Sequence, residues 1–256
     1  MYLEKFSVKD RVAVVTGAGR GIGLEIARAF CEAGAVVIIA EINEPNGCKA
    51  AEQLKQAGYR AGFCALDVTD SGAVDRAADA IAAKYGRIDV LVNCAGYADN
   101  IAALEYPDEE YHRLMRINLD GVWFCCRAFG RHMRSQGGGS IVNVGSMSGL
   151  IVNKPQPQAP YNFSKAAVHM LTKSLACELA GSGIRVNAVA PGYINTEMTL
   201  RGRSNPEWNA CWLEMTPMRR CGEPPEVASV VLFLASEAAS YMTGSIVSVD
   251  GGYTAW

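Results

Sequence analysis

The stretch RVAVVTGAGRGIG, residues 11–23, decides the fold of this chain. Its first half is an apolar, β-branched run that predicts a buried strand, and its second half is rich in glycine. The glycines open a helical pattern over residues 21–34, in which Gly34 stands where a C-terminal cap belongs. A strand, a glycine-rich turn and a helix in this order predict the first unit of an open α/β sheet.

The glycines follow the spacing G-x-x-x-G-x-G, which differs from the common dinucleotide fingerprint G-x-G-x-x-G. Without side chains the backbone turns tightly and comes close to a pyrophosphate, while the free N–H groups of the helix start attract its charge. Such a loop by itself also fits a plain turn, but its place between the first strand and the first helix favours a phosphate site. The expected contacts are Gly17, Arg20, Gly21, Ile22 and Gly23.

Short apolar runs and helical patterns alternate along the rest of the chain. We expect further strands at 36–41, 61–68, 88–96, 140–146, 184–192 and 246–252, and helices at 46–57, 71–85, 108–135, 161–180 and 225–236. About seven strands with helical crossovers predict a doubly wound Rossmann-type parallel sheet, flanked by helices, in a single domain over residues 1–256. The less regular stretch 193–223 follows a strand end, where open α/β sheets bind ligands, so we expect a substrate lid there.

Composition argues against several other classes of protein. The charges, 24 basic and 26 acidic, give −2 without any basic run, so no nucleic-acid partner is expected. No apolar run is long enough for a membrane span, and the charged start MYLEKFSVKD lacks a secretory signal. Nine cysteines without C-x-x-C fit reduced thiols in the cytoplasm, and the three histidines fit no metal-ligand spacing.

The choice between NAD and NADP depends on two residues with opposite charge. Glu41 ends the second expected strand, where a carboxylate accepts hydrogen bonds from both ribose hydroxyls of NAD and repels the 2′-phosphate of NADP. Arg20 could instead pair with that phosphate. Glu41 occupies the ribose position itself, so we expect NAD. The next two strand ends complete the expected cofactor edge with Asp67, Val68, Asn93, Ala95 and Gly96.

Tyr161 and Lys165 form the candidate reactive pair, because residues four apart share one face of a helix. A free tyrosine titrates near pH 10 and is a poor base at neutral pH, but a nearby ammonium stabilises the phenolate. Such a tyrosine takes the proton of an alcohol while hydride leaves the carbon. The spacing alone is common by chance; its position after a strand and two serines, downstream of the glycine loop, gives it weight.

These motifs, in this order and spacing, resemble the short-chain dehydrogenase/reductase family over essentially the whole chain: TGAGRGIG, NCAG, the Asn of RINLDG, GSMSG, YNFSK and APGYINTEM. The resemblance implies Tyr161 as acid/base, Lys165 as the group that binds the nicotinamide ribose and lowers the tyrosine pKa, Ser146 as holder of the substrate oxygen, and Asn118 as support for a proton-relaying water. It also implies a homotetramer or dimer, and nicotinamide contacts from Pro191, Gly192, Ile194 and Thr196.

One departure concerns the catalytic serine. Many members place it thirteen residues before the tyrosine, which fits Ser148, whereas Ser146 lies fifteen before. The strand SIVNVGS runs straight into Ser146, and the proline-bearing loop NKPQPQAP accommodates two extra residues easily. We therefore expect Ser146 to be the catalytic serine.

The substrate is expected to lie between the 153–160 loop and the 193–221 segment, where amides suit a hydroxyl-rich ligand. The candidate contacts are Ser148, Asn153, Gln156 and Tyr193. Several stretches resemble bacterial polyol dehydrogenases of the galactitol type, which implies NAD-linked interconversion of a secondary alcohol and its ketone, with a structural magnesium ion near the C-terminal Trp256. The alternatives are an NADPH-dependent 3-oxoacyl-thioester reductase and a non-catalytic dinucleotide-sensing scaffold.

Overall fold

A seven-stranded parallel sheet forms the centre of the computed structural model, which describes residues 1–256. The strands lie in the order β3-β2-β1-β4-β5-β6-β7. Their bounds are β1 Val12–Thr16, β2 Val36–Glu41, β3 Ala61–Ala65, β4 Val90–Asn93, β5 Gly139–Val144, β6 Ile184–Pro191 and β7 Ile246–Val249. The order reverses between β1 and β4, which is the switch point where open α/β sheets bind ligands.

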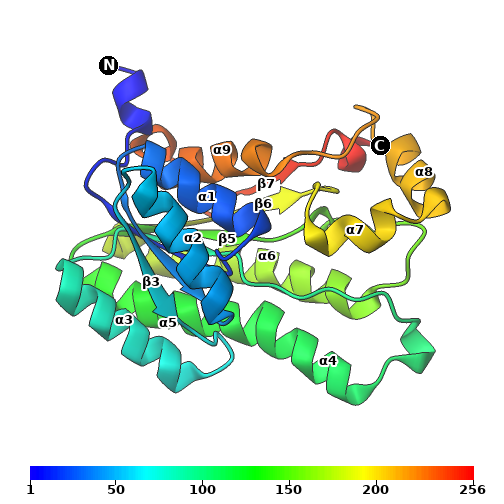
Figure 1. Ribbon diagram of the computed structural model, residues 1–256, viewed down its shortest axis with the longest axis horizontal. Coiled ribbons are helices and arrows are strands. Elements are labelled where there is room, and N and C mark those ends of the chain that lie inside the picture. Colours follow the sequence, from blue (N-terminus) through cyan, green and yellow to red (C-terminus); the bar gives the residue numbers. More distant parts are fainter.

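Helices cover both faces of the sheet (Figure 1). One face packs against α1 (Gly21–Glu32), α2 (Glu44–Gln56) and α9 (Pro224–Ala235) around buried side chains such as Phe30, Leu54 and Leu234. The other packs against α3 (Ser71–Tyr85), α5 (Gly121–Ser135) and α6 (Ala159–Leu179), around Ile81, Phe129 and others. The doubly wound fold expected from the alternation is confirmed.

The strand sequences explain why the sheet is buried on both sides. Val14 of β1 pairs with Ile38 of β2 and Leu91 of β4, and all three are at most 2% exposed. Continuous apolar strands need this two-sided cover. Thr16 closes β1, and its Oγ1 accepts from the backbone N–H groups of Cys94 (3.1 Å) and Ala95 (3.2 Å), which ties the two strand ends together at the switch point.

Two expectations on secondary structure need correction. The stretch 108–135 is not one α-helix: α4 (Asp108–Met115) and α5 are joined by a π-helical turn, Arg116–Asp120. The stretch 193–223 is not irregular, because it contains α7 (Glu197–Arg203) and α8 (Pro206–Met215). Neither helix has a clear apolar stripe, so periodicity misses them; their starts are marked instead by the capping residues Thr196 and Asn205.

Candidate active site

A cavity of about 980 Å³ opens at the carboxyl ends of the strands, on both sides of the switch point. Its wall is assembled from the loop after β1, the ends of β2, β4, β5 and β6, the start of α6, and the α7 segment. All the candidate cofactor residues line this cavity except Asn93, and so do three of the four candidate catalytic residues and all four candidate substrate residues.

The glycine loop is shaped for close approach of the backbone. Gly17 has φ +63°, and a Cβ there would lie 2.7 Å from the Ala95 Cα. A Cβ on Gly23 would overlap the Gly17 carbonyl oxygen. The α1 start that follows has no side-chain cap, so its first N–H groups face the cavity side of the loop without a protein acceptor. This donor set fits a pyrophosphate.

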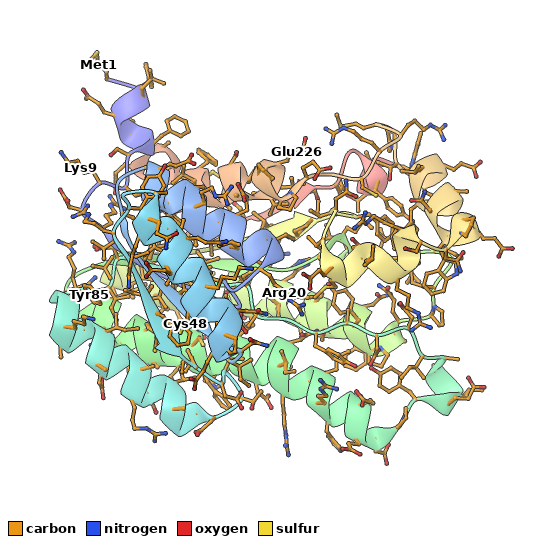
Figure 2. The ribbon with its side chains drawn as sticks, in the orientation of Figure 1. Met1, Lys9, Arg20, Cys48, Tyr85 and Glu226 are labelled. Atoms are coloured by element: carbon orange, nitrogen blue, oxygen red, sulfur yellow. The ribbon has the colours of Figure 1, made fainter.

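Glu41 and Arg20 both line the cavity, but their contacts differ. The two carboxylate oxygens of Glu41 accept from the Gly19 N–H (3.1 Å) and the Asn43 N–H (3.0 Å), which fixes the acid against the glycine loop. Arg20 lies at the start of α1 (Figure 2). It forms an ion pair with Glu197 of α7. Both members of that pair are mostly exposed, so it adds little stability.

The remaining cofactor candidates at strand ends lie either in the wall of the cavity or in the core. Asp67, Val68, Ala95 and Gly96 line the cavity, with Asp67 held by N–H and hydroxyl bonds from Thr69. Asn93 does not line it: its side-chain amide donates to Asn143 Oδ1 at 2.8 Å and to Cys126 Sγ at 3.2 Å inside the core. The Asn93 side chain therefore lies in the core, and a cofactor contact from Asn93 stays a prediction. Pro191, Gly192, Ile194 and Thr196, which follow β6 or end it, all line the cavity.

Two elements bring the reactive groups together. Ser146 lies two residues after the end of β5, and its Oγ caps the short helix Met147–Gly149 by accepting from the Ser148 N–H at 3.1 Å. Tyr161 and Lys165 stand one turn apart near the start of α6, and both line the cavity together with Ser146. Ser148 Oγ lies 3.0 Å from Ser146 Oγ, so the two serine hydroxyls are neighbours in the cavity wall.

Burial dominates the pKa values of the two reactive groups. Lys165 Nζ donates to the Val144 carbonyl at 2.9 Å and lies 5.6 Å from the centroid of the Tyr161 ring. Burial lowers the pKa of Lys165 to about 8. Burial also raises the pKa of Tyr161, while the Ser146 side chain acts in the opposite direction. The lowering of the tyrosine pKa by Lys165, which the resemblance implies, stays a prediction.

Asn118 lies just behind the cavity wall. It sits in the π-helical turn, is fully buried, and exchanges hydrogen bonds with the backbone of Tyr97: its Oδ1 accepts from the N–H (2.8 Å) and its Nδ2 donates to the carbonyl (2.9 Å). Nδ2 also donates to Ser164 Oγ on α6 at 3.2 Å. π-Helical turns often occur at functional sites, and this one joins the strand-end loop to the catalytic helix.

Polar side chains continue from the serines into the substrate end of the cavity. Ser148, Asn153, Gln156 and Tyr193 are all less than 10% exposed and line the cavity. Tyr193 stacks on Trp212 of α8, with ring centroids 3.7 Å apart and planes 8° apart. Gln158 joins the group through hydrogen bonds to Ser148 and Asn153, both at 3.2 Å.

Sequence reasoning missed the residues at the cavity mouth. The cavity is lined there from the loop after β4, from α4 and from the π-helical turn, by Tyr97, Asn100, Glu109, His112, Arg113 and Arg116. Their spacing carries no motif, and nothing in the sequence places α4 beside α6. In the structure Tyr111 of α4 packs against Phe163 of α6, with ring centroids 6.1 Å apart, and Glu110 of α4 accepts from the Tyr97 hydroxyl at 3.2 Å.

Comparison with known proteins identifies the family. A family model described as Enoyl-(Acyl carrier protein) reductase matches residues 17–254. Galactitol 2-dehydrogenase (L-tagatose-forming) of Cereibacter sphaeroides is 51% identical over 255 residues, covering 100% of this chain and 99% of that protein. The chain belongs to the short-chain dehydrogenase/reductase family, and it is an NAD(P)-dependent enzyme acting on alcohol groups.

Solved structures agree with this fold. The crystal structure of gox2181 has a TM-score of 0.99 and 49% identity, with 100% of both chains covered. A gluconate 5-dehydrogenase from Burkholderia cenocepacia J2315, in complex with NADP and tartrate, has a TM-score of 0.96 and 36% identity, again over 100% of both chains. The sequence-based expectations of the family, the fold and an enzyme are confirmed.

Two further findings concern the chain outside the cavity. None of its helices combines the length and apolar character that a membrane crossing requires. Within one chain, no group of three His, Cys, Asp or Glu side chains is placed to hold a metal ion. Trp256 is exposed, and its indole N–H donates to the Met215 carbonyl at 2.9 Å; a structural magnesium ion near the C-terminus stays a prediction.

Proposed function

We propose that this enzyme oxidises a secondary alcohol of a sugar alcohol or vicinal diol to the ketone or ketose, with NAD as hydride acceptor, and catalyses the reverse reduction. The observation that carries the proposal is the continuous set of hydroxyl and amide groups, Ser148, Asn153, Gln156 and Gln158, that begins beside Ser146 and Tyr161. A buried site lined by hydrogen-bonding groups favours a substrate with several hydroxyls, because such a substrate forms hydrogen bonds with them that an apolar substrate cannot form.

In the mechanism Tyr161 is the acid/base, and NAD supplies the hydride-accepting ring when bound. Ser146 holds the reacting oxygen, while Tyr161 takes its proton in oxidation and returns it in reduction. Lys165 anchors the nicotinamide ribose, and Asn118 holds the strand-end loop for a proton path to Lys165. Because burial raises the pKa of Tyr161, oxidation gains from rising pH and reduction from falling pH.

The preference for NAD is supported by Glu41. Its carboxylate is fixed at the strand end by two backbone N–H groups, where each oxygen retains a lone pair for a ribose hydroxyl. Arg20, the residue that favours a 2′-phosphate, is paired with Glu197. The galactitol-type relative, with 51% identity over the whole chain, favours the polyol substrate in the same way.

We also propose a homotetramer in the cytoplasm, with α7 and α8 acting as the substrate lid. The assembly is supported by large apolar side chains exposed on α5 and α6, namely Trp123, Phe163 and Met170. The reducing compartment is supported by nine cysteines without a disulfide. Light scattering after size-exclusion chromatography measures the assembly, and a monomer would contradict it.

A substrate screen tests the proposal. Sugar alcohols, 1,2-diols, ketones and 3-oxoacyl thioesters are each offered with NAD(H) and NADP(H), and the absorbance of the reduced cofactor is followed. We expect polyols or diols to react, and NAD to be used in preference to NADP. The competing function, NADPH-dependent reduction of a 3-oxoacyl thioester, is retained because the description of the matching family model, Enoyl-(Acyl carrier protein) reductase, names a reductase of a related thioester on acyl carrier protein. If only those thioesters react, the polyol proposal fails.

A further inference from the structure

Hydrogen bonds of fixed direction run from the lid helix α8 to the serine pair. The indole N–H of Trp212 can only donate, and it donates to Gln156 Oε1 at 2.9 Å. This bond sets the orientation of the Gln156 amide, whose NH₂ group therefore donates to the Tyr193 hydroxyl (2.9 Å) and to Gln158 Oε1 (3.0 Å). Trp212, Gln156 and Tyr193 are all less than 10% exposed, so water does not compete for these groups.

The orientation is passed on to Gln158. With its oxygen turned to Gln156, its NH₂ group must face the other way, where it donates to Ser148 Oγ at 3.2 Å and to Asn153 Oδ1 at 3.2 Å. The same nitrogen lies 2.7 Å from Asn162 Oδ1. The two amide protons of Gln158 are thus shared among three acceptor oxygens. Because the amide nitrogen faces Ser148, Gln158 cannot accept a hydrogen bond from the Ser148 hydroxyl.

Ser148 therefore faces an amide group of Gln158 that can only donate to it. Its Oγ accepts from Gln158 Nε2 at 3.2 Å and lies 3.0 Å from Ser146 Oγ. The nearest protein acceptor for the Ser148 proton, Ser146 Oγ, already accepts from the Ser148 N–H, and Ser148 lines the cavity. A buried hydroxyl in this setting is a donor to whatever oxygen enters the cavity beside Ser146.

We infer that Ser148 is a one-way hydrogen-bond donor to the substrate oxygen next to the reacting one, and that Gln158, oriented through Gln156 by Trp212, is the specificity-determining residue that makes it so. The substrate class is a secondary alcohol with an oxygen on the adjacent carbon, such as a vicinal diol or an α-hydroxyketone. This rests on the proposed function, since it presupposes that Ser146 and Tyr161 hold the reacting oxygen.

The test uses the variant Gln158→Glu with two alcohols, 2,3-butanediol and 2-butanol, which differ by the second hydroxyl. A carboxylate at this position accepts the Ser148 proton and ends its donation to substrate. We expect kcat/KM for the diol to fall by about tenfold, the effect of one lost hydrogen bond, while 2-butanol changes little. In ketone reduction at low pH the introduced carboxyl is protonated and donates again, so the variant should recover relative to the parent for acetoin.

Three controls keep the result interpretable. Gln53→Glu makes the same charge change on the exposed face of α2 and should alter neither alcohol. Gln158→Met removes the donor without adding an acceptor, and should lose part of the diol preference with no pH-dependent recovery. Circular dichroism and a melting curve establish that each variant is folded; if Gln158→Glu is not, Gln158→Met carries the test with the same pair of alcohols.

The outcomes separate the inference from the proposed function. Equal losses for diol and 2-butanol, or a diol preference that Gln158→Glu leaves intact, overturn the inference and leave the polyol function standing. A parent enzyme that oxidises neither alcohol nor any sugar alcohol overturns the proposed function and the inference with it.

Discussion

The two halves of the cavity are built from different material. The nucleotide half is mainly backbone: the Gly17–Gly23 loop, the uncapped α1 start and the small residues after β4, with Glu41 as its main charged side chain. The substrate half consists of side chains joined by hydrogen bonds, from Ser148 through Gln158 to Trp212. A backbone site binds the phosphate groups that all dinucleotides share, whereas a side-chain site changes with each substitution. We therefore expect the substrate half to determine which substrate this enzyme accepts.

The largest effect is expected where the halves meet, at Tyr161. Tyr161→Phe removes the acid/base hydroxyl and keeps the ring, so kcat should fall by about a thousandfold, within the usual contribution of such a group. Binding of NADH, followed by fluorescence, should change little because the nucleotide half is untouched. A variant with parent-like turnover on every alcohol tried would remove Tyr161 from the mechanism.

The second largest effect is expected in the glycine loop of the nucleotide half, on the KM for NAD. Gly23→Ala places a Cβ on the Gly17 carbonyl oxygen, so the loop must shift and the KM for NAD should rise by about a hundredfold. Gly181→Ala is the matched control, because its added Cβ meets nothing within 4 Å. Unchanged NAD affinity in Gly23→Ala would show that the loop does not hold the pyrophosphate.

Glu41 is the acid of the nucleotide half that we expect to bind the ribose. Glu41→Ala should raise the KM for NAD by about tenfold, since charged hydrogen bonds to the ribose are lost, and should improve the use of NADP relative to NAD. The KM for the alcohol should stay constant. Glu44→Ala removes a nearby exposed acid as the control. A cofactor preference that is the same in parent and Glu41→Ala would count against the NAD assignment.

A smaller effect is expected at Asn153, in the substrate half. Asn153→Ala deletes the donor to the Tyr193 hydroxyl, 3.3 Å away, and the acceptor of Gln158. We expect the KM for the polyol to rise by about fivefold, as for one neutral hydrogen bond, with the KM for NAD unchanged. If the KM for NAD changes instead of the KM for the polyol, Asn153 does not belong to the substrate half.

The smallest effect on activity is expected at His169, which packs beside Gly149. Its substitution should instead change how the stability of the fold depends on pH. Burial, together with the charge of Lys165, lowers the pKa of His169 to about 4, against an ordinary value of 6.5. Between these pH values the unfolded chain binds a proton that the folded chain does not, so this contribution to stability is complete above pH 6.5 and is lost as pH falls toward 4. Urea unfolding of His169→Leu should show a flatter pH dependence there; parallel curves would contradict the shift.

The nucleotide half could be predicted from the sequence because its signals are local. Glycine spacing, strand ends and the Tyr161–Lys165 pair are read along the chain, and the structure puts them at one edge of the sheet. The core position of the Asn93 side chain could not be predicted, because a strand's last side chain points to the cavity or to the core by alternation, which the motif does not reveal. The burial that raises the pKa of Tyr161 could not be predicted either, since it depends on the packing around Tyr161.

The substrate half was only partly predictable. Asn153 and Gln156 were found as polar residues of a loop, but their link to Trp212 spans 56 residues in the chain and exists only once α8 is placed. The short helices α7 and α8 lack an amphipathic stripe, and the mouth residues of α4 lack any motif. Long-range contacts between side chains therefore account for most of what sequence reasoning missed.

The central claim is that side chains in the substrate half recognise hydroxyls beside the reacting alcohol. The most direct measurement compares kcat/KM of the parent enzyme for 2,3-butanediol and for 2-butanol with NAD as cofactor. The account predicts a value at least about tenfold higher for the diol, because a substrate without the second oxygen leaves buried hydrogen-bonding groups unpaired. Equal values for the two alcohols would contradict it.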